Sequence, residues 1–201
     1  MLVQTDPPAS EPIALNDAKL HLRVDIADDD TLITALIVAA RQFAESLTGR
    51  SFITQSWQLT LDCFPICLEL ERGKIQTVDS IIYRDMSGTV QTVLFDAPSN
   101  GMQRSTDGNI VADLTALPAR IAPAFGRIWP IPMPEIGAVT VNYTAGYGAA
   151  TDVPQGIKQW MLLRIGSMYA FREEVVAERS IKVDPMPFFD LLLDPFRVAT
   201  A

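Results

Sequence analysis

The chain has 201 residues and a formal net charge of -8, from 24 acidic and 16 basic side chains. Its content of 48% hydrophobic and 20% charged residues is typical of a folded globular protein and excludes a disordered or fibrous chain. The basic residues form no run, which argues against tight nucleic-acid binding, since that relies on clustered cations. DNA can nevertheless slide past an acidic wall that repels it.

The first ten residues contain Asp6 and two prolines but no basic residue and no apolar stretch, so we expect no secretory signal. The longest apolar helical run, residues 32–40, is shorter than the roughly 20 residues that span a bilayer. Together these features predict a soluble, intracellular product.

Residues 11–25 have the spacing of a short amphipathic helix, with Asn16 or Asp17 near its start. This segment holds the single histidine, His21, so one chain cannot assemble a cluster of histidines. A structural role for His21 is favoured over a catalytic one.

A second helix is predicted from the acidic triplet 28–30 onward. Apolar residues recur every three or four positions from Leu32 to Leu47, and Gly49 supplies the stop. Three adjacent carboxylates suggest either a divalent-metal site or acceptors for the free N–H groups of a helix start, and we favour the second.

Three further apolar residues of this helix, Ile37, Val38 and Ala39, lie off its main stripe. The first half of the helix therefore needs two buried faces, and another subunit can provide the second one.

From residue 52 to residue 144 the apolar period changes to two, which predicts an antiparallel β subdomain inserted between helices. The expected strands are 57–61, 68–70, 75–83, 89–95 and 139–143. Prolines in residues 117–134 disfavour a central strand there, so this stretch is predicted to be an extended connection anchored by Trp129. We therefore expect three parts: an N-terminal helical part (1–51), the inserted β subdomain (52–148), and C-terminal helices with a terminal docking peptide (149–201).

Cys63 and Cys67 flank Pro65. They suggest a disulfide or half of a metal site, but zinc usually takes four ligands and the chain has no second cysteine pair. We favour two small apolar residues near a strand turn.

The stretch 143–151, YTAGYGAAT, is the best candidate for a nucleotide site, since a glycine loop between a strand and a helix can hold phosphate. Thr151 stands where the dinucleotide fingerprint requires its third glycine, and no Gly-Lys-Ser/Thr ending follows. A turn with positive φ at Gly146 or Gly148 is the favoured interpretation.

Pro154 is well placed to open a helix over residues 155–174, which is apolar on most sides. We expect it to be both a central core helix and a subunit contact. The apolar peptide 185–198 must dock as well, either on its own subunit or on a partner, and the sequence leaves these two alternatives open.

The order and spacing of these segments resemble the head-tail connector, or adaptor, proteins of long-tailed phages and prophages over nearly the whole chain. The segments that carry the resemblance are EPIALNDAKLHLRV (11–24), the acidic triplet before LITALIVAAR (32–41), FAESLTGR (43–50), QSW (55–57), LTLD (59–62) with Phe64 and Pro65, VDSIIYRD (78–85), VTVNYTAGYG (139–148), VPQGI (153–157), YAFREE (169–174) and LLLDPFRV (191–198). Phe196 stands where that family often has tyrosine, which puts only a hydroxyl hydrogen bond in doubt.

The resemblance implies an α+β fold, in which a helical body of about four helices carries the inserted β subdomain. It also implies a dodecameric ring in the virion neck, assembled in the bacterial host cytoplasm, that touches the portal protein and a stopper or tail-completion protein. Genomic DNA would pass through the lumen, and no catalysis, cofactor, metal or membrane would be involved. Related adaptors occur in gene transfer particles.

We predict two groups of contact residues. The subunit interface is expected at Ile37, Val38, Arg41, Trp160, Arg164 and Tyr169. Docking on the portal or a neighbour is expected at Pro187, Phe188, Phe189, Leu191, Leu192, Leu193, Pro195, Phe196 and Arg197. The rival hypotheses are another neck or tail-completion component and a small nucleotide-binding enzyme.

Overall fold

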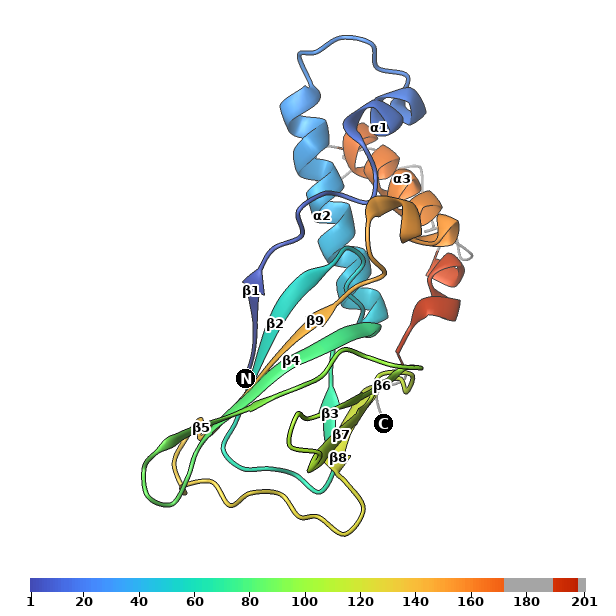
Figure 1. The fold of residues 1–201 in the computed structure, drawn as a ribbon. Coiled ribbons are helices and arrows are strands. Elements are labelled where there is room, and N and C mark those ends of the chain that lie inside the picture. The colour runs from blue at the N-terminus through green and yellow to red at the C-terminus, as the bar shows by residue number, and fades with distance from the viewer. Residues whose placement is uncertain (172–189, 199–201) are drawn as a thin grey trace. The chain divides into compact units, whose positions relative to one another are not determined.

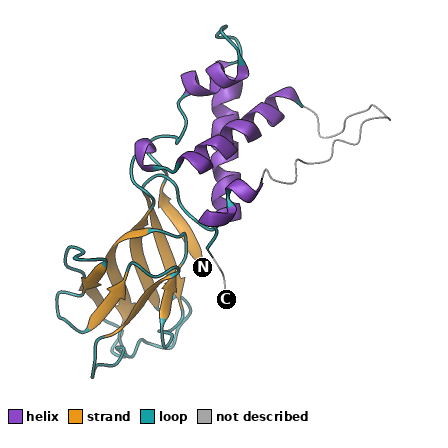
Figure 2. Ribbon diagram, turned by 90° about the vertical axis from the view of Figure 1, so that its right-hand side faces the viewer, coloured by secondary structure: helices purple, strands orange, loops and turns teal. Residues whose placement is uncertain are grey.

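The computed structural model describes residues 1–171 and 190–198. It divides the chain into two compact units, which we call the β unit and the helical unit. Of the described residues, the β unit comprises 1–9, 49–147 and 198, and the helical unit comprises 10–48, 148–171 and 190–197. All described strands fall in the first and all described helices in the second, so the predicted α+β class is confirmed (Figure 2).

The described part of the helical unit has three α-helices: α1 (Leu15–Leu22), α2 (Asp30–Thr48) and α3 (Gln155–Ala170), with contacts between each pair (Figure 1). Helix α2 ends where Gly49 adopts a φ of 66°, as its position after the last apolar residue predicted. Short 3-10 turns lie before α3, at η1 (Ala150–Asp152), and after it, at η2 (Asp190–Leu192) and η3 (Asp194–Phe196). The predicted end of the last long helix, residues 172–174, lies outside the described residues.

Two antiparallel sheets form the β unit. The first has the order β1-β2-β9-β4-β5, and the second has the order β3-β8-β7-β6. Their strands are β1 (Leu2–Asp6), β2 (Gln55–Leu61), β3 (Leu68–Leu70), β4 (Ile75–Arg84), β5 (Val90–Leu94), β6 (Met102–Arg104), β7 (Ile110–Asp113), β8 (Ala119–Pro123) and β9 (Val139–Ala145).

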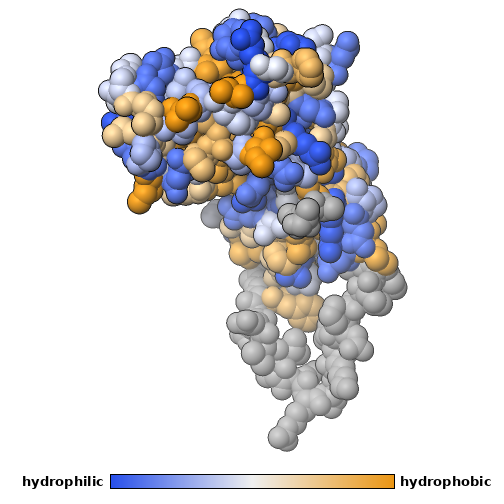
Figure 3. Space-filling model, turned by 90° about the horizontal axis from the view of Figure 1, so that it is seen from below, coloured by the Kyte–Doolittle hydropathy of each residue, from blue (hydrophilic) through white to orange (hydrophobic). Residues whose placement is uncertain are grey.

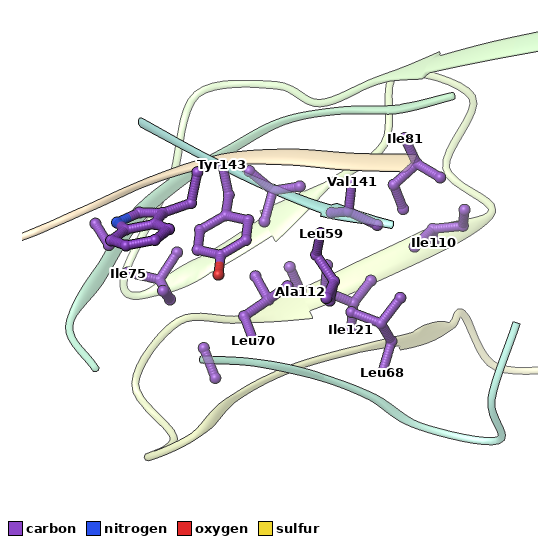
Figure 4. Packing of buried hydrophobic residues seen from close by; sticks show 14 of the residues in the cluster. Leu59, Leu68, Leu70, Ile75, Ile81, Ile110, Ala112, Ile121, Val141 and Tyr143 are labelled. Carbon is purple, nitrogen blue, oxygen red and sulfur yellow. The ribbon is translucent and has the colours of Figure 1, made fainter. Parts of the chain in front are cut away.

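The core of the β unit lies between the two sheets. In β9 alternate residues point inward: Val139 is buried, as are Val141 and Tyr143 (Figure 4). The facing layer comes from the second sheet, with Leu68, Ile110 and Ile121 (Figure 4).

A buried glutamine connects the sheets. Strand β4 shifts register against β9 between Val78 and Ser80, and the side chain of Gln103 bonds both backbone groups of Val78 at 2.8 Å. The amide nitrogen of Gln103 also donates to the Asp96 carbonyl. A buried polar backbone group needs such a partner, so Gln103 stabilises the irregularity.

One expectation about strands was wrong, and one strand was not predicted. The proline-rich stretch contains β8, which lies between β3 and β7, because Pro118 precedes this strand and Pro123 is its last residue. Neither proline therefore interrupts the middle of the ladder. The first residues form β1, an edge strand on β2 in which only Leu2 packs against the core. Its alternation is too weak to be read from the sequence.

Candidate interaction surfaces

The outer face of α2 carries no charge. Apart from Asp30, the exposed or partly exposed residues of α2 are Thr31, Leu32, Thr34, Ala35, Leu36, Val38, Ala39, Gln42, Phe43, Ser46 and Leu47. A helix face in water normally bears charged side chains, so this surface is suited to contact with another protein. We call the residues Ala35, Val38, Ala39 and Gln42 the α2 face.

All three charged side chains of α2 are engaged elsewhere. Arg41 donates from Nε to Glu11 and from Nη1 to Glu45, each at 2.8 Å. Burial lowers the pKa of Arg41, but the hydrogen bond to Glu11 and the charges of Glu45 and Glu11 outweigh that effect and raise it. Asp30, the third, pairs with Lys19 at 2.6 Å.

Two carboxylates of the acidic triplet, those of Asp29 and Asp30, make tertiary contacts. Besides the Asp30–Lys19 pair, the Asp29 carboxylate accepts a hydrogen bond from the hydroxyl of Tyr169 at the end of α3. Among residues 1–171 and 190–198, no group of three or more potential ligands is arranged to hold a metal ion. The hydrogen bonds of Asp29 and Asp30 join the start of α2 to α3 and α1.

The predicted subunit-interface residues divide by exposure. Ile37 and Trp160 are 2% and 0% exposed and pack inside the helical unit, where the Trp160 ring lies 5.8 Å from that of Phe43. Arg41 is also buried. Val38, Arg164 and Tyr169 keep partial exposure, and the Arg164 guanidinium lies 4.9 Å from the Phe43 ring centroid.

The described part of the predicted docking peptide packs on its own helical unit. Leu193 is fully buried, Phe196 lies against Gly156, and the Trp160 indole donates to Asp190 at 3.2 Å. Leu191, Leu192, Pro195 and Arg197 stay exposed, while Pro187, Phe188 and Phe189 lie outside the described residues. Of the two alternatives left open by the sequence, the structure shows packing on the same subunit for residues 190–197.

A second apolar surface lies at one end of the β unit. Strand register places Leu61 beside Val139 and Val139 beside Tyr83, so loops 62–67 and 124–138 leave from the same end. These loops expose four large side chains with at least four fifths of their surface free: Ile66, Phe125, Ile128 and Ile136. We call these four residues the loop surface. Figure 3 views the molecule from below and shows hydrophobic residues on the surface between hydrophilic ones.

Aromatic stacking fixes the two loops to each other. The Trp129 and Phe64 rings are parallel within 7° at 4.6 Å, and Phe64 meets Tyr83 edge-on. The predicted anchoring role of Trp129 is therefore confirmed. Because the loops are held in place, their exposed residues form a defined surface.

The glycine loop after β9 is not free to bind phosphate. The N–H groups of Gly146 and Tyr147 donate to the carbonyls of Lys74 and Phe52, and the N–H of Ala149 donates to the Asp152 carboxylate. Gly146 and Gly148 have φ values of 140° and 132°, so the predicted positive-φ turn is confirmed. A Cβ on Gly146 would lie 2.5 Å from the Ile53 carbonyl oxygen, which explains the need for glycine.

The two cysteines, Cys63 and Cys67, are free and exposed in the loop between β2 and β3. His21 is exposed on α1. In the part of the chain that the structure describes, no helix combines the length and apolar character required to cross a membrane.

The β4–β5 turn at the same end depends on Asp85. Its carboxylate accepts from Ser87 and Gln91 side chains and from the backbone of Thr89 and Ser87, and these bonds lower its pKa to about 2. A carboxyl with a depressed folded pKa stabilises the fold above its unfolded value of about 3.9 and loses that contribution as pH falls.

We therefore expect the turn to loosen between about pH 4 and pH 2, seen as faster amide exchange at Ser87 and Thr89. Carboxyl NMR should give an Asp85 pKa near 2. The Asp85→Asn variant should show no such pH-dependent loosening. An Asp85 titration at the ordinary value for aspartate would contradict this assignment.

The chain is similar to known proteins in sequence and in fold. Residues 12–86 match the model of the phage gp6-like head-tail connector protein family. This range covers α1, α2 and the strands from β2 to β4. No curated protein matches the sequence.

Solved structures with a similar fold come from gene transfer agent (GTA) particles. They include the neck of an empty particle computed with C6 symmetry, 22% identical with a TM-score of 0.74, and the virion of a native particle, 20% identical with a TM-score of 0.72. The neck of a native particle computed with C12 symmetry is 20% identical, with a TM-score of 0.68. Each comparison covers 100% of this chain and 97% of the other.

At this level of identity, the solved structures establish a common fold. Together with the family match, they confirm the resemblance to head-tail connectors that the sequence indicated. Connector and neck proteins are structural proteins, in agreement with the expectation of no enzymatic activity.

Proposed function

We propose that this chain is a head-tail connector subunit, twelve copies of which form a ring beneath the portal in the neck of a phage or gene transfer particle. The observation that carries the proposal is the agreement of two comparisons: the connector family over residues 12–86 and the neck fold over the whole chain. Neck structures computed with C6 and C12 symmetry support copies arranged around an axis.

The ring contact is assigned to the α2 face. Copies in a ring meet head to tail, so one patch must fit a different patch on the next copy. The α2 face lacks charge, and its two alanines permit close approach of a partner. Val38 takes part directly, with Arg164 and Tyr169 at the border, whereas Ile37, Arg41 and Trp160 support the face from within the core.

The two remaining neighbours of a connector, the portal and a stopper or tail-completion protein, require separate surfaces. We assign portal docking to the C-terminal segment, which still exposes Leu191 and Leu192. The loop surface is assigned to the stopper, because exposed apolar groups on fixed loops suit a protein partner. Genomic DNA would pass without adhering, since the net charge of -8 favours repulsion.

Electron microscopy of particles tests this function. With a small tag inserted at the exposed Gly88 turn, we expect extra density between portal and tail, and particles lacking the chain should be DNA-filled heads without tails. Tag density at another site of the particle would favour the rival neck or tail-completion role. Normally tailed particles in the absence of the chain would overturn the proposal.

A further inference from the structure

The β unit has a pocket that no part of the proposed function uses. It has a volume of about 610 Å³ and lies beside the start of β4. Its wall is largely apolar, with Ile75, Pro98, Leu114 and Leu117, and two cations, Arg50 and Lys74, line it as well. Leu117 and Lys74 are exposed, so the rim is accessible to a side chain from outside.

The cations of this pocket are held in place. The Lys74 ammonium lies 5.6 Å from the centroid of the Tyr147 ring, and Arg50 packs against Gly73, where a Cβ would come within 2.4 Å of the Arg50 Cγ. Within the described part of the chain, no carboxylate forms an ion pair with Lys74. An apolar cavity with cations at its wall selects an apolar group flanked by negative charge.

The chain itself carries such a group. In the segment between α1 and α2, Ile26 is 60% exposed and is flanked by the exposed carboxylates of Asp25 and Asp28. Asp29 and Asp30 are engaged with Tyr169 and Lys19, but no described side chain forms an ion pair with Asp25 or Asp28. We call residues 25–28 the acidic knob.

We propose that the acidic knob of one copy inserts Ile26 into the β4 pocket of a second copy of this chain, with Asp25 and Asp28 facing Lys74 and Arg50. The contact joins two different patches, so it repeats from copy to copy as a closed ring requires. This inference rests on the proposed function, because it supplies a second contact between neighbours in the connector ring.

Cysteine cross-linking in assembled particles tests the contact. The variant Ile26→Cys/Leu117→Cys, in a background with Cys63→Ser and Cys67→Ser, should give a ladder of covalent oligomers after mild oxidation. A mixture of the two single-cysteine variants should stop at dimers, because each copy then offers only one half of the contact. The matched control is Ile26→Cys/Leu94→Cys, since Leu94 is also exposed but does not line the pocket, and it should give no ladder.

Charge reversal provides an independent measurement. Lys74→Glu alone, or Asp25→Lys/Asp28→Lys alone, should lower incorporation into particles about tenfold or more, because like charges then face each other. The combination of all three should restore it in part, because one introduced lysine then faces the glutamate at position 74 while Arg50 keeps its positive charge.

The outcomes separate the two proposals. If the chain occupies the neck but the cysteine pair gives no ladder and charge reversal has no effect, the knob contact is overturned and the proposed function stands. If the chain is absent from the neck, the proposed function fails and the contact falls with it.

Discussion

Replacement of Arg41 by methionine should lower the free energy of unfolding of the helical unit by about 3–5 kcal/mol. Methionine keeps most of the apolar stem, so the loss comes from the carboxylates of Glu11 and Glu45, which are left without their cation. Their side chains are only 25% and 10% exposed, so water cannot replace the guanidinium fully. Urea unfolding followed by tryptophan fluorescence measures the change.

The neighbouring Gln42→Met substitution is the matched control, because Gln42 is exposed on the same helix and should change stability by about 0.5 kcal/mol or less. The triple variant Glu11→Gln/Arg41→Met/Glu45→Gln should recover much of the loss, since removing all three charges leaves none unpaired. A change below about 1 kcal/mol in the single variant would show that the ion pairs do not stabilise the helices.

Ala39→Glu should abolish tail attachment while leaving the chain folded. Ala39 is exposed on the α2 face and glutamate is a good helix former, so the free protein should keep its stability within about 0.5 kcal/mol. At a subunit contact the same carboxylate would be buried without a partner, at a cost of about 2–5 kcal/mol per interface. Repeated around a ring, this cost should reduce tailed particles about 100-fold or more.

The fraction of DNA-filled heads that carry tails, counted by electron microscopy, gives the readout. Asn16→Glu is the control, because Asn16 is exposed on α1, outside the α2 face, and an acidic residue is favourable in a first helical turn. Normal tailing with Ala39→Glu would remove the α2 face from the ring contact. Equal losses in both variants would indicate a general effect of added charge.

The position of the C-terminal segment bears on how a connector would engage its partner. Residues 190–197 pack on α3 of the same chain, with Leu193 and Phe196 inward and Leu191 and Leu192 outward. Deleting this segment would expose α3, so loss of assembly in a truncated chain would have two explanations. Substitutions at Leu191 and Leu192 separate docking from folding.

Local patterns in the sequence predicted the helices well. Helix α2 was found from its apolar spacing of three and four and from Gly49, and α3 from Pro154, because these signals act within a few residues. The β2, β4 and β9 strands followed from alternation, since their inner faces are buried in one core.

The contact residues were harder to predict. A nearly all-apolar helix needs cover, but the sequence does not say whether the same chain or a neighbour provides it. The side chains of Ile37 and Trp160 are covered by the same chain. The loop surface was missed because its four residues come from two separate loops, 62–67 and 124–138, that have no regular apolar period.

By itself, the sequence determined the α+β class, the main helices and strands and the acidic character, because these depend on composition and short-range periodicity. The resemblance to connectors rested on the order and spacing of its segments. Only the tertiary structure decided that Arg41 is held by Glu11 and Glu45, that β8 is a central strand, and that the amides of the glycine loop already have partners. Each of these depends on residues distant in sequence, whose pairing is fixed by packing and hydrogen-bond satisfaction rather than by any local pattern.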